Sequence, residues 1–412
     1  THLDQLKELL SAWHGTSKPD TKTLADNRKF TTIMNRSMGA KDDPPQFTWF
    51  VDPIQIAKTA GRGNLTAQAG LALLPAIGLD GLQGIGGSLI MATGEFDSVS
   101  HIHVLIDEPR SGALEALAVT SGDTTPEPWV PVDASTYMTI NFDVDKSYQS
   151  IIKVYNSFRG EGALEGEVKK NISDRLELDF EKELLAACAG RFTYFTWIEK
   201  PVRIDSNATL IGVKLKDAEA FQEVMDKLTT KYADRLVKTA YGTTPYWHMK
   251  GREPGVEAQR DPNRVRLNVR PPQPSFAILG DYLLISDRPS CLEQAIITSA
   301  DSSKSLANDL EFKLIAAKIK RQPGGDAPGM ISFNRPEEGM RMLYDLANAE
   351  NTREVLKSQA ERNNLFKSVD KAMNDNPLPP FAVIAKYLAP GGGLLISDET
   401  GFHYAAFQLR RK

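Results

Sequence analysis

The feature of the chain that most constrains its fold is a set of residues that recurs, in the same order, near both ends. Thr23–Ile33 aligns with Ser305–Ile315, and a further pair of segments aligns after a gap of one residue. The identical pairs are Leu24/Leu306, Ala25/Ala307, Phe30/Phe312, Ile33/Ile315, Asp43/Asp326, Pro45/Pro328, Phe50/Phe333 and Pro53/Pro336. This agreement exceeds what unrelated sequences give, so it indicates related structural units.

A second block of identities follows the first at both ends of the chain. Its pairs are Ala76/Ala382, Gly86/Gly392, Gly87/Gly393, Leu89/Leu395, Ile90/Ile396 and Phe96/Phe402. Because the two blocks keep their order, we predict that Leu24–Ile106 and Leu306–Leu409 are two copies of one unit and superpose as one fold. The polar stretch Asn348–Asn376 is expected to be a helical insertion in the second copy.

Each copy is predicted to contain a helix, a strand, a second helix and then two strands. Phe47–Val51 and Met330–Phe333 are the first strands, and Pro53 and Pro336 follow them at positions that suit the first turn of a helix. Asp398–Gly401 has the composition of a hairpin turn. The closing strands are predicted at Ser88–Thr93, Ser100–Ile106, Leu394–Ser397 and Phe402–Leu409.

The middle third shows the same alternation of strands and helices with a different sequence. Asp217 begins an amphipathic helix that reaches Tyr232, because apolar residues recur every three or four positions from Ala220 to Leu228. Strands are predicted at Tyr137–Phe142, Arg191–Ile198 and Ala208–Leu215.

These elements predict an α+β protein of antiparallel sheets, with helices packed on one face of each sheet. At 412 residues the chain is long enough for several units. The second copy carries its helical insertion near 348–376, and the middle unit carries a long loop at 250–274. The predicted division is 1–119 (first repeat unit), 120–132 (proline-rich linker), 133–274 (middle unit) and 275–412 (second copy).

Charge and hydropathy exclude some classes of partner. The net charge of −4 comes from 53 acidic and 49 basic residues spread along the chain, so nothing indicates binding to nucleic acid or an anionic membrane. No apolar run reaches about 18 residues, and we expect no transmembrane segment. Cys188 and Cys291 predict neither a disulfide scaffold nor a zinc site, and Cys188 is expected to be a small core residue in a helix at Leu184–Gly190.

The glycine-rich segment Gly81–Gly87 has a superficial likeness to a phosphate-binding loop. A dinucleotide site needs its glycines after a strand and before a helix, so that helical N–H groups face the phosphate. The predicted order in this chain is helix, glycines, strand. We therefore expect a helix C-cap and a tight turn.

Two histidines are candidates for a metal site. His101 and His103 stand two residues apart on a predicted strand, so both side chains project from one face. A third ligand is normally needed, and the sequence shows none, so we expect an exposed sheet face and no bound metal. His248, between Trp247 and Met249, is expected to be a strand residue beside the loop.

Two charged segments could also form sites. One holds the acids Asp174, Glu177, Asp179, Glu181 and Glu183. Their spacing is more typical of a helix start, where acids favour the positive end of the dipole, than of paired catalytic carboxylates. The other segment is a loop with Arg252, Arg260, Arg264, Arg266 and Arg270, for which we favour a solvated loop over an anion site. No known catalytic or metal motif occurs, so no catalytic, cofactor-binding or metal-binding residue is assigned.

Three segments carry a resemblance to a known family: Ser305–Asn308, Leu279–Asp287 and Leu378–Gly392. In them the chain resembles large exported proteins of planctomycete-type bacteria that are built from domains of unknown function, and the likeness covers most of the chain. The resemblance implies an extracytoplasmic location, in the periplasm or cell envelope. It carries over no catalytic residue and no cofactor.

The leading functional hypothesis is a non-enzymatic exported binding or assembly protein of the cell envelope, with a protein partner or with copies of itself. One alternative is a carrier of an apolar ligand, which an apolar pocket would favour. The other is an enzyme with an unfamiliar site, which a concave cluster of ionisable groups with shifted pKa values would favour. A large exposed apolar patch would favour the binding or assembly protein.

The beginning of the chain indicates that the first copy lacks a strand, so Thr1 is not expected to be its natural start. Leu3–Gln5 matches Leu292–Gln294, which lies in a predicted helix that follows the strand Asp281–Ser286. No counterpart of that strand precedes Leu3. We expect that an upstream segment or a partner supplies it, because an unpaired edge invites pairing.

Overall fold

The structure is a computed structural model of the chain. It describes residues 2–15, 22–38, 44–91, 94, 96–251, 270–322, 325, 327–361 and 363–410. Most of the predicted loop at 250–274, with Arg252, Arg260, Arg264 and Arg266, lies outside the described residues, as does Thr1.

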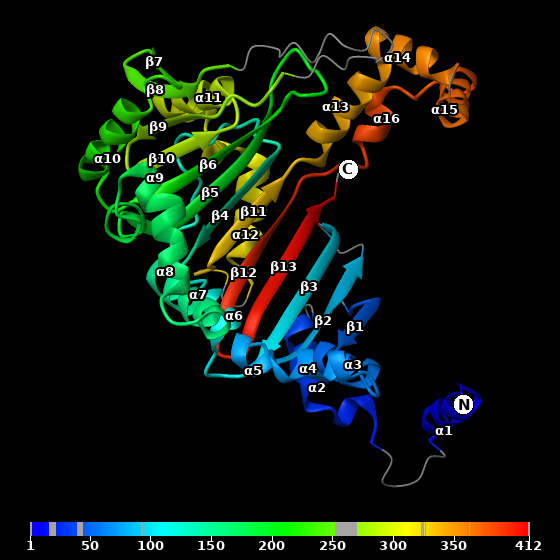
Figure 1. Cartoon of the computed structure of the whole chain (residues 1–412). Coiled ribbons are helices and arrows are strands. Elements are labelled where there is room, and N and C mark those ends of the chain that lie inside the picture. The colour runs from blue at the N-terminus through cyan, green and yellow to red at the C-terminus, as the bar shows by residue number, and fades with distance from the viewer. Residues whose placement is uncertain are drawn as a thin grey trace.

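The strands form a single antiparallel sheet (Figure 1). Among the described residues, thirteen strands lie in the order β1-β2-β3-β13-β12-β11-β4-β5-β6-β10-β9-β8-β7. With the helices that join them, they make this an α+β protein, as the sequence predicts. The strand bounds are β1 Phe47–Val51, β2 Leu82–Met91, β3 Phe96–Ile106, β4 Thr136–Asn141, β5 Cys188–Ile198, β6 Asn207–Leu215, β7 Leu236–Tyr241, β8 Thr244–Met249, β9 Ser275–Leu279, β10 Tyr282–Ser286, β11 Met330–Asn334, β12 Gly391–Asp398 and β13 Gly401–Leu409.

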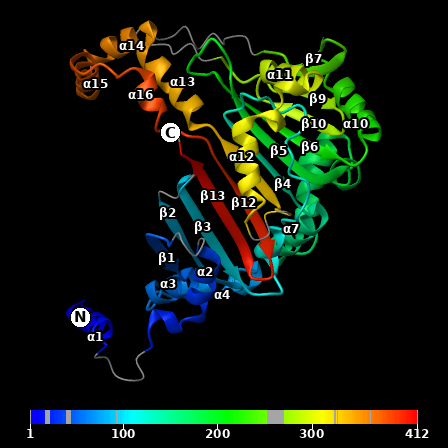
Figure 2. The same cartoon turned by 180° about the vertical axis from the view of Figure 1, so that it is seen from behind.

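Helices pack on both faces of this sheet. α2 (Arg28–Ser37), α11 (Pro289–Ala300) and α12 (Leu310–Ile319) pack on the face that Figure 2 shows, called the back face below. α10 (Ala218–Lys231) packs on the opposite, front face, so the middle third has helices on both faces. The other helices are α1 His2–Trp13, η1 Leu24–Asp26, α3 Pro53–Ala60, α4 Leu65–Ala72, α5 Leu74–Ile77, α6 Gly112–Ala116, α7 Val144–Arg159, α8 Ala163–Val168, η2 Lys169–Ser173, α9 Asp174–Leu176, η3 Phe180–Leu185, η5 Ser302–Lys304, η6 Leu306–Asn308, α13 Pro336–Asn348, α14 Glu350–Ala360, α15 Asn364–Asp375 and α16 Phe381–Ala385.

The predicted units are not separate in space. β1, β2 and β3 form one edge of the sheet, β13, β12 and β11 lie next to them, and the strands of the middle third form the rest. β3 pairs with β13 over most of its length, so the first and last thirds of the chain are joined directly. The order of the units across the sheet therefore differs from their order in the sequence.

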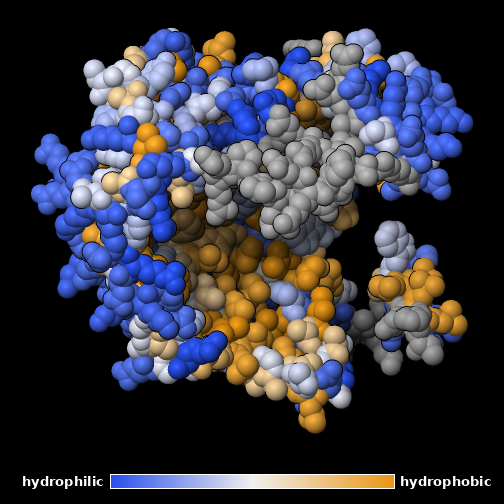
Figure 3. All heavy atoms as spheres, turned by 45° about the horizontal axis from the view of Figure 1, so that its top comes forward, coloured by the Kyte–Doolittle hydropathy of each residue, from blue (hydrophilic) through white to orange (hydrophobic). Residues whose placement is uncertain are grey.

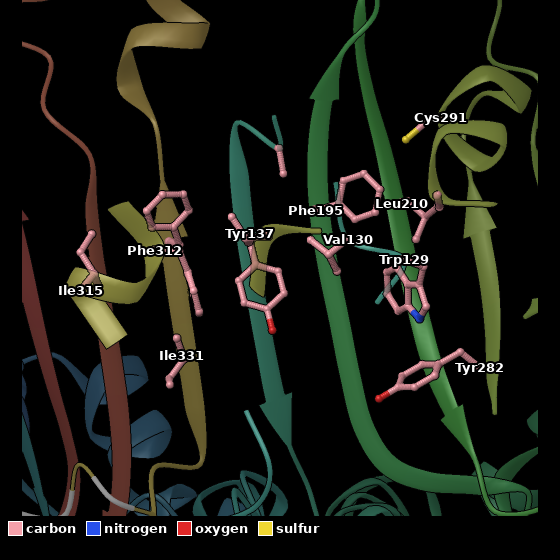
Figure 4. Packing of buried hydrophobic residues seen from close by; sticks show 14 of the residues in the cluster. Trp129, Val130, Tyr137, Phe195, Leu210, Tyr282, Cys291, Phe312, Ile315 and Ile331 are labelled. Atoms are coloured by element: carbon pink, nitrogen blue, oxygen red, sulfur yellow. The ribbon is translucent and has the colours of Figure 1, made fainter. Parts of the chain in front are cut away.

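The predicted linker at 120–132 contains no helix or strand, but it belongs to the core. Trp129 and Val130 are buried there. The Trp129 ring packs against Tyr282 of β10, with 5.4 Å between the ring centroids, as Figure 4 shows. This proline-rich segment thus has an irregular backbone, and it places apolar side chains in the back-face core.

That core lies between the sheet and the helices α11 and α12. Tyr137 of β4 is fully buried, and its ring meets the edge of Phe312 of α12 at a centroid distance of 6.0 Å (Figure 4). Phe195 of β5 and Leu210 of β6 are also fully buried. Each such side chain contributes roughly 1.5–3 kcal/mol to stability on burial, so this face holds the sheet and its helices together.

Most of the glycine-rich segment lies inside a strand, and of its glycines Gly81 lies in a turn, as predicted for the whole segment. Gly84, Gly86 and Gly87 belong to β2, whereas α5 ends at Ile77 and is capped by Gly78, whose φ of 69° suits a helix C-cap. A Cβ on Gly86 would lie 2.8 Å from Cγ2 of Ile33 in α2. Glycine is therefore needed for the close approach of a helix to the sheet.

The same arrangement occurs in the last third. A Cβ on Gly392 of β12 would lie 2.6 Å from Cγ2 of Ile315 in α12. Phe50 pairs with Gly86, and Phe333 pairs with Gly392. These residues are the pairs that the sequence alignment matches, although the internal repeat itself stays a prediction.

The N-terminal helix α1 lies apart from the sheet in both views (Figures 1 and 2). Its apolar side chains are exposed, with 86% of the Trp13 surface accessible. β1 is the last strand at this edge, and the expectation that another strand pairs with the first unit stays a prediction. Among the described residues, no helix is long and apolar enough to cross a membrane.

Candidate functional site

The front face of the sheet carries apolar side chains that helices leave uncovered. Figure 1 shows β2, β3, β13 and β12 from this side, with helices only around them. Along β3, His101 and His103 face the back and are buried, while Ile102 and Val104 face the front and are half-exposed. The side of an antiparallel sheet that faces water is usually polar, so this arrangement is the reverse of the expected one.

The register places the front-facing residues of neighbouring strands side by side. Ile102 pairs with Tyr404 of β13, and Met330 of β11 pairs with Ile140 of β4. We call the following half-exposed residues the open face: Ile85, Leu89, Ile102, Tyr404, Met330, Met138 and Ile140. Figure 3 shows apolar atoms gathered in a broad hollow on this side of the molecule.

The cavities on this side are open to solvent. One, of about 310 Å³, is lined by Ser98, Ser100, Ser332 and Asn334 together with Tyr404. An enclosed ligand pocket would cover most of its ligand with apolar side chains. This cavity is instead an open part of a wide surface on which apolar side chains alternate with hydroxyl groups.

A cluster of three histidines lies on the back face of the same strands. His403 of β13 pairs directly with His103 of β3. Nδ1 of His101 lies 3.3 Å from Nε2 of His403, and the two rings are stacked with their centroids 5.4 Å apart. The His103 ring lies 5.7 Å from that of His403. The predicted exposed sheet face is therefore wrong for these histidines, which α2 and α12 cover.

Burial determines the protonation of this cluster. It lowers the pKa of His101 and His103, and burial together with the charges of these two neighbours lowers the pKa of His403 to about 3. All three imidazoles are thus neutral at neutral pH. The two ring nitrogens of His103 and Nδ1 of His403 have no hydrogen-bond partner in the described part of the protein.

A cavity of about 420 Å³ opens onto His101 and His403 from the back. Arg321 and Gln322, which follow α12, form part of its wall. Arg36 at the end of α2 also lines it and forms an ion pair with Asp398. Among the described residues that line this cavity, none is a serine, a cysteine or a carboxylate, so the histidines have no nucleophile to activate there.

A second buried cluster surrounds the ion pair of Arg191 and Glu127. The Nη2 atom of Arg191 lies 3.0 Å from Oε1 of Glu127, and both side chains are almost fully buried. Burial raises the pKa of Glu127, and the positive charge of Arg191 partly opposes this rise. The hydroxyl of Tyr282 donates a hydrogen bond to the same carboxylate. Because both members of the ion pair are almost fully buried, we assign this cluster to stability.

The remaining candidates have structural roles. Asp179 caps η3 by accepting hydrogen bonds from the backbone N–H groups of Glu181 and Lys182, which confirms the prediction of a helix start. Cys188 begins β5 and does not lie in the predicted helix, because η3 already ends at Leu185. Both cysteines are free.

Two further candidates are held by local contacts. His248 lies in β8, as predicted, and its Nδ1 is 2.8 Å from the side-chain amide of Gln273. Arg270 is the one arginine of the predicted basic loop among the described residues. Its backbone and side chain donate hydrogen bonds to Asp205, so its positive charge is paired with a carboxylate of the same chain.

Sequence reasoning missed the two features with the most chemical interest. To predict the open face, one must know which side of each strand is buried. To predict the histidine cluster, one must know that β3 pairs with β13. The only signal for the cluster in the sequence was the pair His101 and His103. Comparison with protein-family models, with curated proteins and with solved structures found no match.

Proposed function

We propose that this chain is a non-enzymatic binding protein whose open face binds the apolar surface of a protein partner. The observation that supports the proposal is the row of half-exposed apolar residues across β2, β3, β13, β11 and β4. Contiguous apolar surface of this kind marks interaction sites in water-soluble proteins. The hydroxyl groups of Ser98, Ser100 and Ser332 beside it can satisfy polar groups of a polypeptide.

A protein partner fits this surface better than a small apolar ligand. The open face extends over neighbouring strands and is not enclosed, whereas carriers bury most of a small ligand inside a cavity. An enzymatic role has less support, because the described wall of the histidine cavity contains no nucleophile or carboxylate. In line with the family resemblance, we propose that binding takes place in the cell envelope.

The proposal predicts where cross-links form in native cells. A photo-reactive residue is placed at Ile102 on the open face and, in a matched control, at Leu310 of α12, which is 76% exposed on the back face. We expect one recurring polypeptide to be cross-linked through position 102 and not through position 310. Mass spectrometry of the adducts identifies it, and fractionation of the same cells tests the location.

A charged substitution supplies the second arm of this test. Ile102→Glu is expected to reduce binding of the identified polypeptide by about tenfold or more, because it places a charge against an apolar surface. Leu310→Glu is expected to leave binding unchanged. Adducts with lipid alone would support the apolar-ligand carrier instead, and equal adducts at both positions would contradict the proposed function.

A further inference from the structure

The pairing of β3 with β13 places two imidazole nitrogens at the spacing of metal ligands. Zinc–nitrogen bonds of about 2.0–2.1 Å in tetrahedral geometry hold two ligating nitrogens about 3.3–3.4 Å apart. Nδ1 of His101 and Nε2 of His403 are 3.3 Å apart. Both rings are fixed by strands in the middle of the sheet, where the backbone is held by pairing on both sides.

These two nitrogens lie within hydrogen-bond distance of each other, and a bound metal ion would replace that contact. The His101 side chain is buried, and the other ring nitrogen of His403, Nδ1, has no hydrogen-bond partner among the described residues. Buried polar atoms are normally satisfied by protein, water or an ion. Arg36, which lines the same cavity, forms an ion pair with Asp398.

We propose that His101 and His403 bind a divalent transition-metal ion at the floor of the back-face cavity. Imidazole suits zinc, copper and nickel, and affinity rises towards copper along the divalent series. Within the described residues, no group of three His, Cys, Asp or Glu side chains surrounds a common point. Solvent in the cavity therefore completes the coordination, and binding is weaker than at a structural zinc site with four protein ligands.

The site is independent of the proposed partner surface. It lies on the back face, under α2 and α12, whereas the open face is on the front of the same strands. A bound ion would link the first and last thirds of the chain, because His101 and His403 belong to adjacent strands from the two ends of the sequence.

The test is a titration of the chelator-treated full chain with zinc sulfate alone, and then with copper sulfate, at about pH 7.5. We expect saturation at one ion per chain, with a rise in the thermal unfolding temperature. His101→Gln and His403→Gln are each expected to weaken binding by about tenfold or more. His14→Gln, in the exposed turn after α1, is the control and should bind like the unaltered chain.

X-ray absorption of the zinc-loaded, unaltered chain gives a measurement that does not depend on the folding of a variant. It should report two imidazole ligands and light-atom ligands from solvent. Absence of saturable binding would overturn the proposal. So would equal affinities for the unaltered chain and the folded His101→Gln and His403→Gln variants, or an absorption spectrum without imidazole.

Discussion

Arg191→Met is expected to lower the free energy of unfolding by about 3–5 kcal/mol, because it leaves a buried carboxylate without its partner. Arg191 is 5% exposed, and its guanidinium contacts Glu127, Asp123 and Thr139. Methionine fills a similar volume but cannot compensate the charge of Glu127. Urea unfolding at neutral pH, followed by circular dichroism, measures the loss.

Two companion variants decide whether the buried pair is the cause. Arg191→Met combined with Glu127→Gln should recover much of the loss, because glutamine removes the charge and still accepts the hydrogen bond from Tyr282. Arg410→Met breaks a more exposed pair with Asp97 and should cost at most about 1 kcal/mol. Equal losses for Arg191→Met and Arg410→Met would contradict this account.

Gly392→Ala is expected to destabilise the protein by about 1–3 kcal/mol through overpacking. The added Cβ would lie 2.7 Å from the carbonyl oxygen of Ser332 and 2.6 Å from Cγ2 of Ile315. The first of these atoms is backbone and cannot turn away, so α12 or β11 must move. Gly86→Ala should behave alike, since its Cβ would lie 2.7 Å from the carbonyl oxygen of Trp49.

The control for these variants is Gly70→Ala. Gly70 lies within α4, and no atom comes within 4 Å of a Cβ built on it. Alanine there should raise stability by up to about 1 kcal/mol, because it favours the helix over the unfolded chain. The thermal unfolding temperatures of Gly392→Ala, Gly86→Ala and Gly70→Ala, measured together, test the overpacking explanation. It would be abandoned if Gly392→Ala and Gly70→Ala shifted the temperature in the same direction.

Local structure was predicted well where a short-range signal fixed it. β1 has the predicted bounds, because Asp52 caps α3 and Pro53 occupies its first turn. α10 begins after the predicted cap Asp217, and Phe221, Val224 and Met225 of the predicted apolar stripe are buried, whereas Ala220 at its start is exposed. These features depend on residues close in sequence, so helix capping and periodicity suffice to find them.

The sites could not be predicted because they depend on which side of a strand is buried. In β3 the alternation of Ile102 and Val104 with His101 and His103 suggests that the apolar residues point inward. The structure has the opposite arrangement, since the histidines lie under helices and the apolar residues face the front of the sheet. No local rule shows that such a sheet keeps apolar residues on its uncovered side.

Long-range pairing and close packing were the other obstacles. His403 is about three hundred residues from His103 in the sequence, and only the register of β3 with β13 makes them neighbours. Gly84–Gly87 reads as a turn because glycine weakens strands. Glycine is needed in β2 because α2 approaches the strand closely. That approach is a tertiary contact, which a local pattern does not reveal.

The pairing of β3 with β13 also has a consequence for folding during synthesis, because the two strands are made far apart in time. β3 ends at Ile106, but its partner begins only at Gly401, so one edge of β3 stays unpaired while the residues between them are synthesised. At synthesis rates of about 5–20 residues per second, that wait lasts about 15–60 s. During this time an apolar strand edge is open to wrong pairing. Nascent chains of this protein should therefore depend on chaperones until β13 emerges.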